Sequence, residues 1–304
     1  MPELPEVETV RRTLIEGGLV GRRIVRAQVL HPDAVRHPAP QEFAQTLKGR
    51  RIAGIGRRGK YLLLALDAGV LVAHLRMTGR LWLSLPEAEE LVHTHVVFDL
   101  DDGRQLRFRD VRRFGGFHLL QDAGDPAAPQ GLRELGPEPD ALRARDIRDA
   151  CARHARLAIK GLLLDQRVVA GLGNIYVDEA LHRARVHPAR ACGSLTQREH
   201  GRLADALREV LGEALANRGT TFLDFRDGTG EPGAFQEFLR VYQREGLPCR
   251  NCGTPIAKTR VAGRGTHYCP KCQKGDGFPS STARTRTTTR SRPAKTSSGS
   301  RRAR

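Results

Sequence analysis

The chain has 304 residues, of which 51 are Lys or Arg and 34 are Asp or Glu, so its formal net charge is +17. This balance predicts a polyanionic partner, either nucleic acid or an anionic membrane surface. No apolar run approaches the ~18 residues of a membrane span, and no basic segment followed by an apolar core marks export, so we expect a cytoplasmic protein that acts on nucleic acid and makes no membrane contact.

The first 120 or so residues predict mainly strands, with one helix at the start. Over residues 2–16, four apolar side chains share a helical face and two glycines end the run: Val7, Val10, Leu14 and Ile15, then Gly17 and Gly18. Short strand-like runs follow, with turn signals at 67–69 and 101–103; they cover residues 24–30, 52–55, 61–66, 70–75, 95–100, 105–108 and 116–120. This pattern predicts an antiparallel two-sheet sandwich or barrel.

The second half of the chain is predicted to be helical. Residues 136–139, Gly-Pro-Glu-Pro, have the composition of a linker. The clearest helix covers residues 197–216, because Thr196 and Glu199 form a capping box before it and the run from Asn217 to Gly219 stops it.

The end of the sequence differs in composition from the rest. Residues 279–304 contain eight basic residues and no acidic one, in a low-complexity Ser/Thr/Arg background. We expect this tail to be disordered. Without its eight charges the remainder still carries +17 − 8 = +9, so the folded part is basic in its own right.

A glycine-bearing turn lies between two helical stretches, at residues 168–176. A dinucleotide-binding fingerprint would need a third glycine at position 176, which is Tyr176. Two interpretations remain open. The turn could begin a helix whose backbone N–H groups, with Asn174, hold a phosphate, or it could be an ordinary turn between helices.

Four of the six cysteines form two CxxC knuckles with sixteen residues between them: Cys249, Cys252, Cys269 and Cys272. This spacing predicts one structural Zn²⁺, whereas two disulfides are improbable in a reducing cytoplasm. The insert predicts a β-hairpin with a candidate turn at 263–265 and a basic tip made of Lys258, Arg260 and Arg264. Cys151 and Cys192 have no partner motif and are expected to be core or surface thiols.

The chain opens with a candidate nucleophile. A small residue at position 2 permits removal of Met1, which would leave Pro2 with a secondary amine beside the carboxylates of Glu3 and Glu6. An α-amino group titrates near pH ~8, so it can attack an aldehyde-like carbon to give an iminium ion. The alternative is a simple helix start, because Pro and Glu are both favoured in a first turn.

Together, the opening PELPEVETV, the LGNIYVDEAL turn and the paired CxxC knuckles resemble bacterial formamidopyrimidine-DNA glycosylase. Members of this family remove oxidised purines, including 8-oxoguanine and formamidopyrimidines, and nick the resulting abasic strand. The resemblance runs from Pro2 to about Gln273. It implies a bifunctional glycosylase and AP lyase that acts on duplex DNA as a monomer, at the nucleoid of a bacterial cytoplasm.

The resemblance also implies an α+β fold, with DNA in a cleft between two domains. We expect an N-terminal two-sheet β-sandwich with flanking helices, then a helix–two-turn–helix domain and a β-hairpin zinc finger. The expected ranges are 1–130 for the catalytic sandwich, 131–145 for a linker, 146–245 for the helical domain, 246–273 for the zinc finger and 274–304 for a disordered basic tail.

Family roles carry over to matching positions. Pro2 is expected to attack C1′ of the damaged nucleotide, Glu3 to act as general acid or base, and Glu6 to shape the site. Lys60 would contact the phosphate beside the lesion, although an isolated lysine is otherwise a solvated charge. The expected DNA-binding residues on the other side of the cleft are Asn174, Tyr242 and Arg264.

Removing a nucleotide from the stack leaves a gap that side chains must fill. Met77, Arg112 and Phe114 match the family's three void-filling residues, although without the resemblance Met77 and Phe114 would be assigned to the core. Val111 departs from the family, which usually has proline there.

Two alternatives compete with oxidised-purine repair. The first is a glycosylase of the endonuclease VIII type, which acts on oxidised pyrimidines and usually has glycine at the position of Leu4. Leu4 and a Gly-rich stretch at residues 227–233, similar to a lesion-capping loop, favour purines. The second is a zinc-finger DNA-binding protein without catalysis, which gives no reason for Pro2 beside Glu3.

Overall fold

A computed structural model describes residues 2–89, 91–122, 124–222 and 225–275. The expected disorder at 274–304 therefore lies, for residues 276–304, outside the described residues. Within the described ranges no helix is long and apolar enough to cross a membrane.

Helix α1 (Leu4–Glu16) begins the fold, as predicted, with Pro5 in its first turn. Val7, Val10 and Leu14 are completely buried, but Ile15 is 37% exposed. The prediction was wrong for Ile15, because each residue turns about 100° around the helix and Ile15 therefore lies beyond the edge of the buried face.

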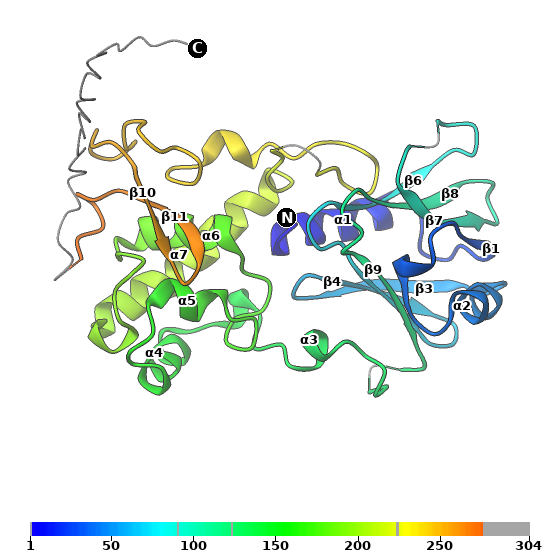
Figure 1. The fold of residues 1–304 in the computed structure, drawn as a ribbon, viewed down its shortest axis with the longest axis horizontal. Coiled ribbons are helices and arrows are strands. Elements are labelled where there is room, and N and C mark those ends of the chain that lie inside the picture. The colour runs from blue at the N-terminus through cyan, green and yellow to red at the C-terminus, as the bar shows by residue number, and fades with distance from the viewer. Residues whose placement is uncertain (1, 90, 123, 223–224, 276–304) are drawn as a thin grey trace, which may run out of the picture.

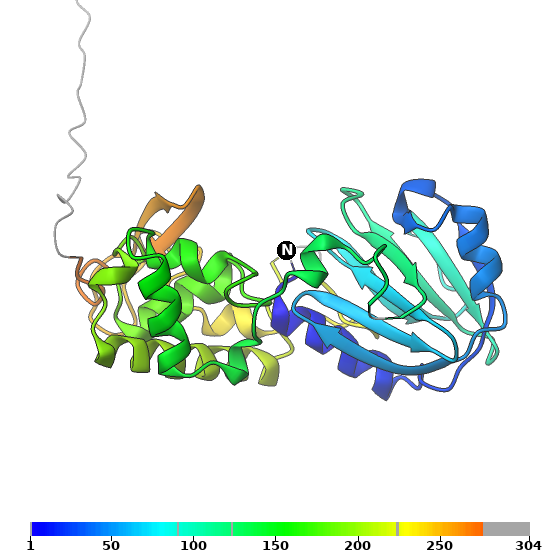
Figure 2. The ribbon, with the colours of Figure 1, turned by 90° about the horizontal axis from the view of Figure 1, so that it is seen from below.

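Two sheets form the N-terminal part, with strand orders β1-β7-β8-β6 and β2-β9-β5-β4-β3. All neighbours are antiparallel except β2 and β9, which run parallel. The strands are β1 (Ile24–Val29), β2 (Val35–His37), β3 (Ile52–Arg58), β4 (Tyr61–Leu66), β5 (Val70–His74), β6 (Gly79–Ser84), β7 (Thr94–Leu100), β8 (Gln105–Asp110) and β9 (Gly116–Leu120). Figure 2 shows the two sheets facing each other, with α1 along one edge.

Three elements of this part were not predicted: β2, β6 and helix α2 (Pro40–Leu47). Strand β2 has only three residues, and α2 buries only Phe43 and Leu47, so neither shows a readable period. Strand β6 does not alternate either, because Trp82 is buried between the buried Leu81 and the partly buried Leu83, and the strand directly follows a loop without a turn signal.

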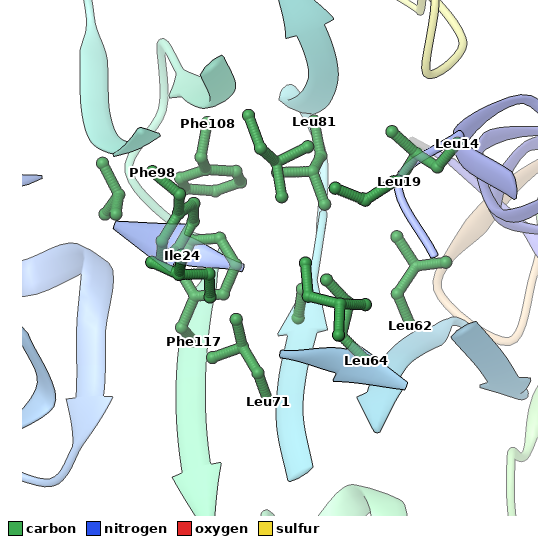
Figure 3. Packing of buried hydrophobic residues seen from close by; sticks show 14 of the residues in the cluster. Leu14, Leu19, Ile24, Leu62, Leu64, Leu71, Leu81, Phe98, Phe108 and Phe117 are labelled. Atoms are coloured by element: carbon green, nitrogen blue, oxygen red, sulfur yellow. The ribbon is translucent and has the colours of Figure 1, made fainter. Parts of the chain in front are cut away.

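Aromatic rings fill the space between the sheets. Figure 3 shows Phe98 of β7 and Phe108 of β8 close to Phe117 of β9. The ring centroids of Phe98 and Phe117 are 5.5 Å apart, and those of Phe108 and Phe117 are 4.9 Å apart, both in edge-to-face geometry. Leu14 and Leu19 belong to the same buried cluster, so this core also holds α1 on the sandwich.

A second core lies among the helices of the C-terminal half. Its helices are α4 (Ala144–Arg153), α5 (Ile159–Leu164), α6 (Asn174–Ala184) and α7 (Gln197–Ala216), with 3-10 turns at Pro139–Ala141, Cys192–Ser194 and Phe235–Phe238. The short helix α3 (Gln130–Arg133) packs through Leu132 against the sandwich, which has its own 3-10 turn at Pro32–Ala34. Helix α7 has the predicted bounds, and its capping box forms between Thr196 and Glu199.

The chain then forms a hairpin of β10 (Ala257–Val261) and β11 (Arg264–Tyr268), which lies against α6 (Figure 1). Its turn is Ala262-Gly263, with positive φ at both residues, so it begins one residue earlier than predicted. This conformation suits a two-residue hairpin turn. The predicted α+β fold, with a two-sheet sandwich, a helical second part and a terminal hairpin, is confirmed.

Candidate active site between the two cores

A cavity of about 650 Å³ lies where the sandwich meets the helices. Its wall includes most of the site residues predicted from the sequence: Pro2, Glu3, Glu6, Lys60, Met77, Asn174, Tyr242 and Arg264. They come from the start of the chain through α1, from two sandwich loops, from the start of α6, from the segment between Phe238 and the hairpin, which carries Tyr242, and from the hairpin itself. Arg112 and Phe114 are not part of this wall.

The Glu3 carboxylate is bound by the N terminus of α6. It accepts a 3.0 Å hydrogen bond from the Ile175 backbone N–H, and the Tyr176 N–H lies at 3.5 Å. Gly173 allows this approach, because a Cβ there would be 2.3 Å from the Glu3 carboxyl carbon. The backbone N–H groups of the glycine turn therefore bind a carboxylate of this chain, which neither interpretation of the turn anticipated.

Burial raises the pKa of Glu3 to about 7, and the nearby Lys60 ammonium only partly offsets this effect. Glu3 is 2% exposed. A carboxyl group with a pKa near neutrality populates both protonation states, which is the property that general acid–base catalysis needs. Glu3 can thus donate a proton in one step and accept one in another.

Glu6 connects the two cores from the same helix. One carboxylate oxygen accepts hydrogen bonds from the Tyr176 hydroxyl and, at 2.7 Å, from the Thr220 N–H. The other accepts the Glu3 N–H at 2.8 Å. Burial raises the pKa of Glu6, and these hydrogen bonds oppose that rise. Glu6 therefore fixes the backbone of Glu3 rather than facing solvent.

Lys60 follows Gly59 in the tight turn between β3 and β4 and points inward. Its Nζ donates to the Leu172 carbonyl at 2.8 Å, and the residue is 8% exposed. Burial lowers the pKa of Lys60 from its usual value, while Glu3 opposes that change. Lys60 is therefore not a solvated surface lysine, which was the alternative interpretation from the sequence.

The opposite wall is held together by contacts between α6 and the hairpin. The Asn174 side-chain amide donates to the Gly265 carbonyl at 2.9 Å, next to the exposed Arg264. The ring of Tyr242 lies 5.7 Å from that of Phe222 and 5.2 Å from that of His267. Asn174, Tyr242 and Arg264 therefore share one side of the cavity.

A completely buried ion pair holds the hairpin in this position. The Lys160 ammonium on α5 donates to Asp178 Oδ1 at 2.7 Å, to Thr266 Oγ1 at 2.8 Å and to the Gly265 carbonyl at 3.0 Å. Asp178 also accepts the His267 N–H at 2.9 Å. All three ammonium protons have partners, which is the condition under which a buried charge is tolerated.

Met77, Arg112 and Phe114 form a cluster on the surface rather than part of a core. Met77 is 39% exposed and Phe114 is 50% exposed. Arg112 connects them: its Nη1 lies 3.4 Å from the Met77 sulfur, and its guanidinium is 4.8 Å from the centre of the Phe114 ring. Exposed large apolar side chains held by one arginine indicate a binding surface.

Several residues of the wall were missed by sequence reasoning, and His74 is the clearest. Its Nδ1 accepts a 2.9 Å hydrogen bond from the Arg76 N–H, and its ring meets Tyr61 edge-to-face at 4.4 Å. Burial lowers the pKa of His74 to about 3, so the ring is neutral at physiological pH. A histidine at the end of a predicted strand carries no local signal of this role.

The Gly-rich stretch at 227–233, which resembles a lesion-capping loop, does not line the cavity in this structure. Gly228 packs against α1, accepting the Leu83 N–H at 2.8 Å and donating to Thr13 Oγ1 at 2.8 Å. The preceding residues Thr220, Phe222 and Phe225 reach the cavity instead.

The four knuckle cysteines converge, with their sulfur atoms all within 4.8 Å of one another. Two of the Sγ–Sγ distances are 3.5 Å (Cys252 to Cys269) and 3.9 Å (Cys249 to Cys272). A tetrahedral zinc with Zn–S bonds of about 2.3 Å needs sulfur separations of about 3.8 Å, so the donor set fits one Zn²⁺. The predicted zinc site is confirmed, and Cys151 and Cys192 are buried core thiols.

Three family models match consecutive parts of the chain. The formamidopyrimidine-DNA glycosylase N-terminal domain matches residues 1–117, the formamidopyrimidine-DNA glycosylase H2TH domain matches 135–225, and the zinc finger found in FPG and IleRS matches 246–275. They define a protein with the three-part build of a DNA glycosylase.

Comparison with individual relatives gives the same result as the family models. The chain is 54% identical over 276 residues to the formamidopyrimidine-DNA glycosylase of Symbiobacterium thermophilum (90% of this chain, 89% of the relative) and 48% identical over 277 residues to that of Bacillus subtilis (90% and 99%). Among solved structures, MutM (FPG) of Thermus thermophilus has a TM-score of 0.80 at 44% identity (90% and 98%). Lactococcus lactis Fpg in complex with an abasic site containing DNA has 0.82 at 38% (90% and 100%). The chain belongs to the formamidopyrimidine-DNA glycosylase family.

Proposed function

We propose that the chain is a bifunctional base-excision repair enzyme that removes oxidised purines from duplex DNA and then cleaves the abasic strand. The observation that carries the proposal is the buried Glu3 carboxyl, with a pKa of about 7, adjoining Pro2 in the cavity. Family membership supports it, as do complexes of Lactococcus lactis FPG with a Fapy-dG containing DNA and with abasic DNA.

The reaction begins once Met1 is removed and Pro2 has a free amine. The Pro2 nitrogen forms a bond to C1′ while the glycosidic bond breaks, and the base leaves with the electron pair and with the proton that the Pro2 nitrogen loses. Protonation of the ring oxygen by Glu3 opens the sugar, which leaves an iminium ion between Pro2 and C1′. The iminium acidifies the C2′ proton, so the 3′ phosphate leaves by β-elimination and the 5′ phosphate by δ-elimination.

The other site residues bind DNA in this proposal. Lys60 contacts the phosphate beside the lesion, and Asn174, Tyr242 and Arg264 hold the backbone of the extruded nucleotide from the opposite wall. Met77, Arg112 and Phe114 fill the gap in the duplex, where the Arg112 guanidinium can donate hydrogen bonds to the base left without its partner. Two observations support these assignments: Lys60, Asn174, Tyr242 and Arg264 line one cavity, and the exposed pair of Arg112 and Phe114 contacts Met77 of its wall.

Zinc, when bound by the four cysteines, supplies structure rather than catalysis. The four cysteines would occupy all four positions of a tetrahedral zinc, so none would be open to a substrate. We further propose the division into 1–130, 131–145, 146–245 and 246–273, and a monomer that works at the nucleoid in the cytoplasm. The two separate cores support a division near residue 135.

Borohydride trapping tests the covalent step. Reduction during reaction with a duplex that contains 8-oxoguanine should fix the DNA to the N-terminal peptide, and Pro2→Gly should trap poorly. Retaining Met1 through a blocked N terminus should abolish both adduct and nick, because the amine becomes an amide. An adduct mapped to Lys60 by mass spectrometry would refute this mechanism even if excision persisted.

A panel of duplexes separates the alternatives. Faster excision of 8-oxoguanine than of an oxidised pyrimidine supports the purine assignment, and the reverse order supports an enzyme of the endonuclease VIII type. The pyrimidine substrate is essential, since Lactococcus lactis FPG has also been seen with an oxidised pyrimidine containing DNA. If the protein binds the duplexes but excises no lesion, the remaining interpretation is a zinc-finger DNA-binding protein without catalysis.

A further inference from the structure

Two separate loops carry the exposed cluster of Met77, Arg112 and Phe114. Met77 lies between β5 and β6, whereas Arg112 and Phe114 lie between β8 and β9. Loops that move independently would present these side chains in many relative positions. Beneath them, however, Asp110 at the end of β8 is completely buried.

The Asp110 carboxylate is satisfied by donors from both loops. Its Oδ1 accepts the Thr78 hydroxyl and, at 3.2 Å, the Arg112 N–H, while Oδ2 accepts the Gly115 N–H at 2.7 Å. No salt bridge to Asp110 is present among the described residues. A buried carboxylate without a cation depends on such neutral donors, so their loss would be costly.

The backbone of the second loop takes its shape from these bonds. Arg113 has φ of 57°, a left-handed conformation that is unfavourable for a residue with a side chain. Gly115 has no room for a Cβ, which would lie 2.7 Å from the His74 carbonyl oxygen and 3.1 Å from Asp110 Oδ2. This tight loop turns Arg112 and Phe114 toward solvent on the same side.

Thr78 is the link between the loops. Its hydroxyl donates to Asp110 and also accepts the Arg112 N–H at 3.1 Å. Because Thr78 directly follows Met77, one hydroxyl ties the position of the Met77 loop to that of the Arg112 loop. On the exposed side, the contact of Arg112 with the Met77 sulfur completes the connection.

We propose that Thr78 and Asp110 are positioning residues that hold Met77, Arg112 and Phe114 as one pre-organised wedge, and so set discrimination of the base opposite the lesion. The inference rests on the proposed function, in which this cluster enters the duplex. Pre-organisation lowers the conformational entropy that is lost on binding. An arginine guanidinium also makes two hydrogen bonds to one base edge only when its orientation is fixed.

The test compares two substitutions of one residue. Thr78→Val removes the hydroxyl but keeps the shape, and Thr78→Ser keeps the hydroxyl. Single-turnover excision of 8-oxoguanine is measured opposite cytosine and opposite adenine, and nicking is measured at an abasic site in a single strand. Thr78→Val should reduce the cytosine-over-adenine preference about tenfold, in line with the loss of one buried hydrogen bond. Thr78→Ser should retain the preference, and single-strand nicking should stay the same in both variants.

A mutant cycle shows whether Thr78 acts through Arg112. In an Arg112→Ala background, Thr78→Val should change the opposite-base preference by less than twofold. An unchanged preference after Thr78→Val alone, an equal loss of single-strand nicking, or full additivity with Arg112→Ala would each overturn the inference.

A readout without turnover separates this inference from the proposed function. A fluorescent base analogue opposite a non-cleavable abasic site reports entry of the wedge, and Thr78→Val should slow that signal while Thr78→Ser should not. If wild-type protein excises no lesion, the proposed function fails. If wild type excises and inserts normally but Thr78→Val behaves identically, only the wedge inference fails.

Discussion

Replacing Glu3 by Gln should make the protein more stable at high pH. The pKa of Glu3 is raised from 4.5 to about 7 in the folded state, mainly by burial. The folded protein therefore binds this proton more tightly than the unfolded chain does. The loss of stability that comes from ionising the buried Glu3 is absent below pH 4.5, grows as the pH rises toward 7, and is constant above pH 7. A shift of about 2.5 pKa units at ~1.4 kcal/mol each gives about 3 kcal/mol.

Urea unfolding of the full chain at pH 5, 6, 7 and 8 measures this effect. The stability of Glu3→Gln relative to wild type should increase across the series, by up to about 3 kcal/mol, and excision should be lost. A stability difference that does not change with pH, or a variant less stable than wild type at pH 8, would refute the assignment of a buried, raised-pKa carboxyl.

Glu8 on α1 provides a control, because its pKa is shifted in the direction opposite to that of Glu3. Hydrogen bonds from Arg11, Arg12 and Arg57 outweigh its burial and lower its pKa to about 2. Its ionised form therefore stabilises the fold above pH 4.5, and that contribution disappears as the pH falls through 2. Glu8→Gln should consequently destabilise the protein at every pH of the series, whereas Glu3→Gln should not.

Three other predictions concern the C-terminal half. Cys269→Ala should lose zinc by metal analysis and most DNA affinity, while circular dichroism shows the sandwich still folded; stoichiometric zinc in a Cys249 and Cys269 double variant would contradict it. Deleting residues 279–304 should leave single-turnover excision nearly unchanged but flatten the salt dependence of non-specific DNA binding, because up to eight charges stop displacing counterions; an identical slope would mean that these residues do not touch DNA. Lys160→Met should lower the unfolding free energy by about 3 kcal/mol or more, since Asp178 stays buried without its cationic partner, and adding Asp178→Leu should recover part of it; no recovery would mean that the unpaired Asp178 is not the cause.

Local signals explain which elements were predictable. Helix α7 was predicted to the residue because its capping box and its stop both lie within four residues of its ends. The zinc ligands were predictable because the two CxxC spacings are themselves the chelating geometry. Short elements such as β2 and α2 had too few residues for a period, and Ile15 shows that periodicity does not fix the edge of a buried face.

The site was predictable as a set of residues but not as an arrangement. Pro2 and Glu3 were expected to act together, yet the partner of Glu3 is Ile175, 172 residues away along the chain. The Thr78–Asp110 hydrogen bond likewise joins two loops whose proximity depends on the pairing of β6 with β8. Such contacts depend on the complete fold, and one sequence carries no local trace of them.

The reliance of the N-terminal carboxylates on distant backbone has a consequence for biosynthesis. Pro2 and Glu3 are made long before their surroundings: Glu3 meets its hydrogen-bond partners only after residues 175 and 176 have been made, and Glu6 meets the Thr220 N–H only after residue 220. A nascent or prematurely terminated chain therefore lacks the environment that raises the pKa of Glu3. Under the proposed mechanism, such a chain has the Pro2 amine but not the proton donor that strand cleavage needs, so DNA is cut only by a chain that has been made and folded past Thr220.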